Sequence, residues 1–128
     1  MERRVTVHLN KLVANNVARD MKDKGQNPTI RALDNDEYAQ ALLQKMLEEV
    51  NELIAEPASS KELAQVLLVI EEYAKHRGLL LADLDRLVKQ CRADKGGFDE
   101  RQYVETIELN PDDPWLDYFR ADDRYTIE

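Results

Sequence analysis

One pattern constrains the fold of this chain most: apolar residues recur at spacings of three and four along a stretch free of glycine and proline. The recurring residues are Tyr38, Leu42, Leu43, Met46, Val50, Leu53 and Ile54. This period gathers them on one face of an α-helix. Asp34 and Glu37 have the spacing of a capping box, and Pro57 ends the run. The stretch predicts an amphipathic helix whose apolar face must pack against a partner.

Three further segments carry the same kind of pattern. One begins at Ser59 or Ser60 and ends at Gly78, and its apolar face consists of Leu63, Val66, Leu67, Ile70, Tyr73 and Ala74. The others run over Lys11 to Lys24 and over about Leu81 to Asp94. With four glycines in 128 residues, the composition also favours helices. We therefore expect a mainly α fold, built as a four-helix bundle.

The two ends of the chain differ from this helical body. Val5 to Leu9 alternates apolar and polar residues, and Phe98 to Leu109 does so in part, so a short two-stranded β element from the N- and C-terminal segments is a further expectation. We place a helical domain at 1–109 and an acidic, aromatic C-terminal extension at 110–128. That extension holds half of the eight aromatic residues, which predicts that it docks on the body or on another subunit.

Net charge and cysteine content narrow the classes of partner. The net charge of −8 argues against nucleic acid, because a binder of the phosphate backbone needs a basic face. No apolar run approaches the roughly 20 residues that span a bilayer, so no membrane partner is expected. Cys91 is the single cysteine and allows no internal disulfide, which suits a reducing compartment. The expected location is the cytoplasm.

Carboxylates on two successive helices are the candidates for chemistry. Glu48, Glu49 and Glu52 lie about one turn apart on the predicted helix that ends before Pro57. Glu62 and Gln65 lie about one turn apart on the helix that follows it. A short connection makes the helices antiparallel, so residues at equal height have numbers with a constant sum. One possible register has the sum 114, and it levels Glu52 with Glu62 and Glu49 with Gln65. Side chains that face each other across two packed helices are close enough to reach one ion. Carboxylate oxygens suit a hard cation, Mg²⁺ or Mn²⁺, and such an ion can hold the phosphates of a nucleotide.

A plainer interpretation of the same residues stays open. Glutamate is a good helix former and is common on solvated faces. Glu62 also follows Ser59 by three positions, which is the spacing of a capping box.

The same glutamates carry a resemblance to a family. Glu48-Glu49-x-x-Glu52 and Glu62-x-x-Gln65 are similar to the paired motifs of the all-alpha nucleoside triphosphate pyrophosphohydrolases, the MazG-like proteins. The surrounding order resembles their phosphoribosyl-ATP pyrophosphohydrolase-like branch. The matching pieces are Asn10-Lys11-Leu12-Val13, Gly25, Arg31-Ala32-Leu33, Glu37-Tyr38 and Gly96-Gly97-Phe98.

The resemblance implies a hydrolase that cleaves nucleotides between the α and β phosphates and releases pyrophosphate. It implies Mg²⁺, with Mn²⁺ as a substitute, held by Glu49, Glu52 and Glu62, and with Gln65 at the fourth ligand position. Glu48 would be a ligand or the base that activates water, and Lys11 would contact phosphate. The family also implies a homodimer or homotetramer.

Two departures from the family pattern leave a second interpretation open. Gln65 replaces an aspartate, and Ala14-Asn15-Asn16 replaces Arg-Asp-Lys. Both changes remove charge from the expected site. The alternative is a catalytically impaired relative that acts as a nucleotide-binding or protein-interaction module.

Overall fold

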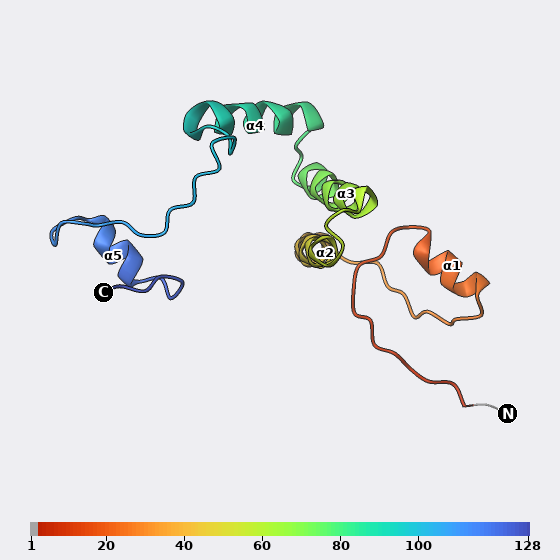
Figure 1. Cartoon of the computed structure of the whole chain (residues 1–128). Coiled ribbons are helices and arrows are strands. Elements are labelled where there is room, and N and C mark those ends of the chain that lie inside the picture. Colours follow the sequence, from red (N-terminus) through yellow and green to blue (C-terminus); the bar gives the residue numbers. More distant parts are fainter. Residues whose placement is uncertain (1–2) are drawn as a thin grey trace. The chain divides into compact units, whose positions relative to one another are not determined.

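The computed structural model describes residues 3–128, and its regular structure is helical throughout that range (Figure 1). The helices are α1 (Val17–Asp23), α2 (Asn35–Ala55), α3 (Ser60–His76), α4 (Leu81–Lys95) and α5 (Trp115–Arg120). The expectation of a mainly α fold is confirmed.

Helix α2 begins and ends where its sequence signals predict. The side chain of Asp34 accepts a hydrogen bond from the Glu37 backbone N–H at 2.9 Å, and the Glu37 carboxylate accepts one from the Asp34 N–H at 3.4 Å. Arg31 holds the Glu37 carboxylate with a 2.7 Å ion pair. This capping box satisfies donors that the first helical turn leaves free. The helix ends at Ala55, ahead of Pro57.

Helix α1 is shorter than the helix expected over Lys11 to Lys24. It begins at Val17 because Asn15 and Asn16 form a turn, and the N-cap residue Asn16 makes no side-chain capping bond. Asparagine hydrogen-bonds readily to nearby backbone and is a poor helix former. The residues before the turn, including Lys11, are non-helical, which frees the Lys11 side chain for a contact described below.

Helices α2 and α3 form the packed centre of the fold. Leu42 on α2 and Val69 and Ala74 on α3 are buried, with Leu42 only 3% exposed. The rings of Tyr38 and His76 pack edge to face with their centroids 5.0 Å apart. The numbers of these two residues also add up to 114, as they do for Glu52 and Glu62 in the register considered above.

The four-helix bundle is not confirmed. Within residues 3–128, α2 and α3 are the only helices that pack closely against each other. Helices α1 and α4 contain no buried residue, so neither adds a layer to the core. Large apolar side chains of the central pair stay exposed, among them Leu47, Ile54 and Leu63. No helix in this range combines the length and the apolar character that crossing a membrane requires.

The expected β element is absent from the described residues. Val5 to Leu9 and Phe98 to Leu109 contain no strand, and their apolar side chains are exposed, with Phe98 at 95%. Alternation makes a strand only when a neighbouring strand takes up its hydrogen bonds, and an isolated two-stranded ribbon is marginally stable in water. The β element is therefore not confirmed.

The chain divides into two compact units, one ending at Cys91 and the other beginning at Arg92. The first contains the packed pair α2 and α3. The second contains α5, whose aromatic side chains pack on one another. The boundary lies inside α4, whereas the sequence analysis places a division between residues 109 and 110. The division at 109 stays a prediction.

Replacing Leu42 by alanine tests how far the chain depends on its small core. Leu42→Ala should lower the free energy of unfolding by about 2–4 kcal/mol, because the lost side chain leaves a cavity between α2 and α3. Urea denaturation followed by circular dichroism measures the change. The matched control Gln40→Ala, at an exposed position of the same helix, should stay within about 0.5 kcal/mol of the parent chain. Equal losses from both variants would contradict this account of the core.

Candidate metal centre

Three glutamates from the two packed helices converge on one point. Glu49 and Glu52 come from α2 and Glu62 comes from α3, and one carboxylate oxygen from each lies within 4.8 Å of the others. The antiparallel register produces this arrangement because it brings the end of α2 level with the start of α3. Glu49 is itself buried. We call these three residues the carboxylate cluster.

The carboxylate of Glu62 is not used in a capping box. The Glu62 backbone N–H donates to Ser59 Oγ at 3.1 Å, as a helix cap requires. The reciprocal donor, the Ser59 N–H, donates instead to the carbonyl oxygen of Glu56 at 3.0 Å. Glu62 Oε2 is buried and has no hydrogen-bond partner among the described residues. A buried carboxylate oxygen without a partner is costly, and a cation at this point would satisfy it.

Mutual repulsion within the cluster alters the protonation of Glu52. The negative charge of Glu49 and a hydrogen bond with Glu49 raise the pKa of the Glu52 carboxyl above its usual range, and Glu62 adds to the effect. Like charges in close contact favour the protonated form of one member. The metal-free cluster therefore holds its negative charge at a cost that a divalent cation would remove.

Lys45 is a functional candidate that the sequence analysis missed. Its Nζ lies 3.3 Å from Glu49 Oε1 and 3.4 Å from Glu48 Oε2, and its side chain is only 19% exposed. The signal was present in the spacing, because Glu48 and Glu49 follow Lys45 by three and four positions on one helix. The ammonium group compensates part of the charge at the edge of the cluster.

Lys11 reaches the same region from the N-terminal segment. Its Nζ lies 3.0 Å from Glu48 Oε1. Asn10, just before it, adopts a left-handed backbone with φ of 46°, which asparagine tolerates better than most residues. The hydrogen bond with Glu48, followed by the charge of that carboxylate, raises the pKa of Lys11. Partial burial works to raise the pKa of Glu48, but the bond from Lys11 and the charge of Lys45 outweigh it and lower that pKa.

Gln65 lies beside the cluster but outside its three carboxylates. It lines a cavity of about 230 Å³ together with Lys11, Val13, Ala14, Val17, Met21, Lys45 and Glu49. Two lysines and a carboxylate thus border one small cavity with an apolar wall from α1 and the segment before it. The cavity combines cationic groups suited to phosphate with the edge of a candidate cation site.

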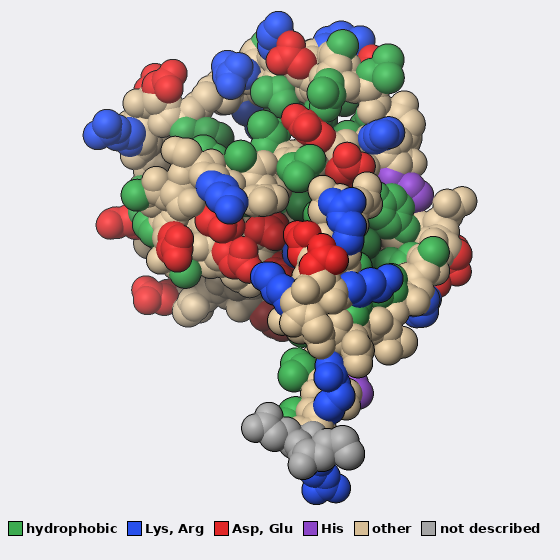
Figure 2. All heavy atoms as spheres, turned by 90° about the vertical axis from the view of Figure 1, so that its right-hand side faces the viewer, with side chains coloured by type: hydrophobic (Ala, Val, Ile, Leu, Met, Phe, Trp, Pro, Cys, Tyr) green, Lys and Arg blue, Asp and Glu red, His purple; other side chains and the backbone are tan. Residues whose placement is uncertain are grey.

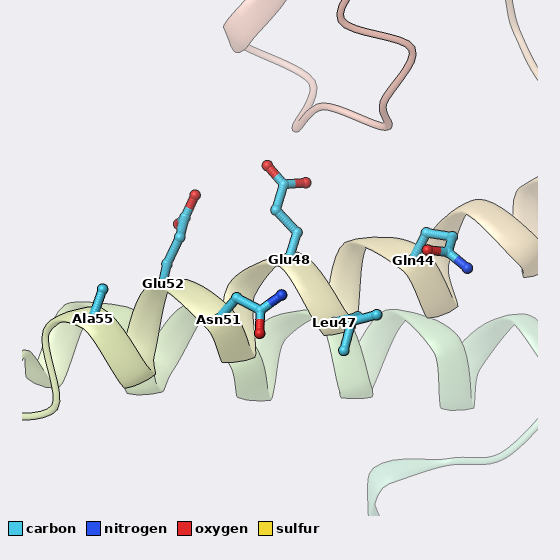
Figure 3. Close-up of a pocket in the computed structure, with 6 residues that line it drawn as sticks. All are labelled: Gln44, Leu47, Glu48, Asn51, Glu52 and Ala55. Atoms are coloured by element: carbon cyan, nitrogen blue, oxygen red, sulfur yellow. The ribbon is translucent and has the colours of Figure 1, made fainter.

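A second depression lies along the outer face of α2 and measures about 470 Å³ (Figure 3). It is lined by Gln44, Leu47, Glu48, Asn51, Glu52 and Ala55. Glu48 and Glu52 point to the same side of the helix (Figure 3). One face of the molecule shows acidic side chains gathered in a patch that Lys and Arg border (Figure 2). At the site itself, Lys11 pairs with Glu48 and Lys45 with both Glu48 and Glu49, so both signs of charge meet there.

The residues present fit a hard divalent cation. The cluster offers carboxylate oxygens only, which are the ligands that Mg²⁺ and Mn²⁺ prefer, and one of those oxygens is otherwise orphaned. Three protein ligands would leave positions for water or phosphate oxygens, as is usual for Mg²⁺ in nucleotide enzymes. The geometry brings together three of the four expected ligands, Glu49, Glu52 and Glu62.

Comparison with known proteins adds nothing to this geometry: the chain matches no protein-family model, no curated protein and no solved structure. The resemblance to the MazG-like pyrophosphohydrolases stays a hypothesis, and it rests on the order of the motifs in the sequence. Any function must be argued from the site itself.

Repulsion within the carboxylate cluster can be tested without any ligand, through its effect on stability. In the folded chain the pKa of Glu52 is raised, so ionisation of Glu52 lowers stability as the pH rises through that pKa. With metal removed by a chelator, Glu52→Gln should unfold at a higher temperature than the parent at pH 7. The difference should vanish below about pH 4, where both chains carry a neutral group at this position.

The matched control is Glu71→Gln on α3, outside the cluster, which loses the same charge. Thermal unfolding across this pH range measures all three chains. An equal gain from Glu71→Gln would show that net charge, and not the cluster, is responsible.

Proposed function

We propose that this chain is a magnesium-dependent nucleotide pyrophosphohydrolase, which cleaves between the α and β phosphates and releases a nucleoside monophosphate and pyrophosphate. The observation that carries the proposal is the convergence of Glu49, Glu52 and Glu62 beside a buried, unpartnered oxygen of Glu62. Carboxylates from two helices can bind the metal ion of a metal-bound polyphosphate, and the lysines beside them can contact its phosphates.

Glu49, Glu52 and Glu62 would hold the cation, with Gln65 next to them as a neutral amide. When bound, Mg²⁺ would neutralise charge on the phosphates and make a bound water more acidic. The amide of Gln65 can offer a carbonyl oxygen but cannot serve as a base. The role of base therefore passes to a carboxylate, and Glu48 is the candidate.

Lys11 would control when Glu48 can act as that base. Its 3.0 Å pair with Glu48 keeps the carboxylate ionised and weakly basic. The phosphates of an arriving substrate would compete with Glu48 for the Lys11 ammonium group. Once released from Lys11, Glu48 keeps only its pair with Lys45, gains basicity and can take a proton from the water whose oxygen attacks phosphorus. The bond to the bridging oxygen then breaks, and pyrophosphate leaves.

The same proposal includes assembly as a homodimer or homotetramer. Its support is the apolar surface that α2 and α3 leave exposed, which includes Leu43, Leu47, Leu67 and Leu68. Large exposed apolar surfaces on a protein often mark a site where another protein packs. A second copy that covers these faces would complete the bundle that one chain alone does not form.

Neutralising the cluster should abolish turnover and leave the fold intact. Glu49→Gln and Glu52→Gln each remove one charged ligand, and we expect at least about a hundredfold loss of pyrophosphate release, as for other losses of a group that acts at the reacting centre. Glu71→Gln is the matched control and should keep full activity. Circular dichroism checks that each variant is folded. Turnover that survives both cluster changes would refute the assigned site.

The substrate can be found in the same experiment. A panel of nucleoside triphosphates is added with and without Mg²⁺, and thermal unfolding is read together with pyrophosphate release. A ligand at a hundredfold excess over its dissociation constant stabilises the fold by about 2.7 kcal/mol. A shift that requires Mg²⁺ and comes with pyrophosphate identifies the substrate. No shift with any nucleotide would contradict the proposal.

A second candidate function is nucleotide binding without hydrolysis. The observation in its favour is Gln65, which lines the small cavity with Lys11 and Lys45 where the family pattern has a carboxylate. The lysines that would contact phosphate remain, while one charged ligand is missing. This function predicts a Mg²⁺-linked unfolding shift without release of pyrophosphate.

Restoring the missing carboxylate separates the two candidates. Gln65→Asp should raise the rate of pyrophosphate release by about tenfold, equivalent to about 1.4 kcal/mol of transition-state stabilisation, if the site is catalytic but weakened. Gln65→Asn is the matched control, since it shortens the side chain in the same way without adding charge. A rate unchanged by Gln65→Asp, in a chain that still binds nucleotide, favours the binding function.

A further inference from the structure

The aromatic residues of the C-terminal segment form a local cluster of their own. Trp115 and Tyr118 pack edge to face at 5.3 Å, Tyr118 and Phe119 at 5.3 Å, and Phe119 and Tyr125 at 5.0 Å. Asp113 Oδ1 accepts a hydrogen bond from the Trp115 N–H at 2.8 Å, at the start of α5. We call the four rings the aromatic cluster. Its arrangement depends on contacts between residues that lie within about a dozen positions of one another in the sequence.

The aromatic cluster remains largely uncovered. Trp115 is 60% exposed, and Tyr118 and Tyr125 are exposed as well. Exposed tryptophan and tyrosine are enriched where proteins bind one another, because each offers a large apolar face with a polar edge. A segment that already holds its shape also loses less conformational freedom when it docks. These features are those of an interaction surface.

The charge of this segment defines the chemistry of its partner. Residues 108–128 contain seven Asp and Glu against two Arg. One of those arginines, Arg124, is paired with Asp122 at 2.7 Å. A surface that covers the aromatic cluster must therefore be apolar and basic, because like charges placed opposite each other oppose docking.

The N-terminal stretch of the same chain has the complementary composition. Residues 3–31 contain seven Lys and Arg against two Asp. Val5, Val7 and Leu9 are exposed and alternate with polar residues along a segment without regular secondary structure. In α1 and just after it, Arg19, Lys22 and Lys24 make no ion pair with any residue in the range 3–128; they are exposed. This stretch offers both apolar side chains and uncommitted positive charge.

We propose that residues 108–128 of one copy dock on residues 3–31 of a second copy. The aromatic cluster covers the strip of Val5, Val7 and Leu9, and the acidic residues around it face the basic residues of α1. Because each copy carries both halves, two copies make the contact twice, in the reciprocal manner of a two-fold dimer. Residues 3–31 also line the small cavity of the candidate site, but the test reads the protection of Trp115 and not turnover, so the contact and the proposed hydrolase activity can fail separately.

Two charge-reversed full-length chains test the proposal. The N-reversed chain carries Arg19→Glu, Lys22→Glu and Lys24→Glu, and the C-reversed chain carries Asp112→Lys, Asp117→Lys and Asp123→Lys. None of the six side chains makes a described hydrogen bond or ion pair, so the local folds should persist. Trp115 is the single tryptophan of the chain, and its fluorescence reports directly on the cover of the aromatic cluster.

In the parent chain, Trp115 emission should shift to the blue and resist acrylamide quenching as concentration rises. Each reversed chain alone should show the same change only at a protein concentration at least about tenfold higher. In such a chain, residues 3–31 and residues 108–128 carry charge of the same sign and repel each other. An equimolar mixture of the two reversed chains should regain it, because each half meets an oppositely charged half on the other chain. Sedimentation velocity should show the mixed pair.

A matched control for the C-reversed chain carries Asp94→Lys, Asp99→Lys and Glu105→Lys, which change net charge by the same amount in the same direction and lie outside residues 108–128. It should behave as the parent does. The proposal is overturned if Trp115 of the parent stays open to quencher at every concentration. It is also overturned if protection does not depend on concentration and mixing restores nothing, which would mean docking within one copy. An equal loss in the control would show that net charge alone is responsible.

Discussion

The antiparallel pairing of α2 and α3 is the constraint on which the rest of the structure depends. One register, in which facing residue numbers add up to 114, puts Tyr38 against His76 at one end and Glu52 level with Glu62 at the other. The core that holds this register is small, with Leu42, Val69 and Ala74 as its buried apolar residues in the described chain. A slip of one turn would separate the carboxylates by about 5.4 Å along the axis.

The carboxylate cluster works against the packing that creates it. Bringing Glu49, Glu52 and Glu62 together lowers the stability of the metal-free fold, as the raised pKa of Glu52 indicates. Lys45 offsets part of this repulsion from within α2, and Lys11 does so for the neighbouring Glu48. Folds keep such locally unfavourable arrangements mainly at functional sites. Glu49 is buried, Glu62 half-buried and Glu52 exposed, so the cluster lies at the margin between the core and solvent.

The sequence predicted the long helices well because their ends depend on local signals. Asp34, Ser59 and Gly78 set helix ends by their own backbone and side-chain chemistry, and Gly78 takes the positive φ of 80° that a helix end of this type requires. The alternation in Val5 to Leu9 failed as a strand signal because pairing depends on a partner that no local pattern supplies. Lys45 was missed because a lysine among helical glutamates is usually only a surface ion pair, and its burial is a tertiary effect.

Helix α2 presents different chemistry in three directions, which links assembly to the site. Leu42 faces the core, Glu49 and Glu52 face the cluster, and Leu47, Asn51 and Ala55 line the outer depression (Figure 3). Glu48 and Glu52 line the same depression. Any copy that packs on the outer face would therefore remove water from these same carboxylates. Since excluding water strengthens both their repulsion and their attraction for a cation, assembly and cation binding at this helix would reinforce each other.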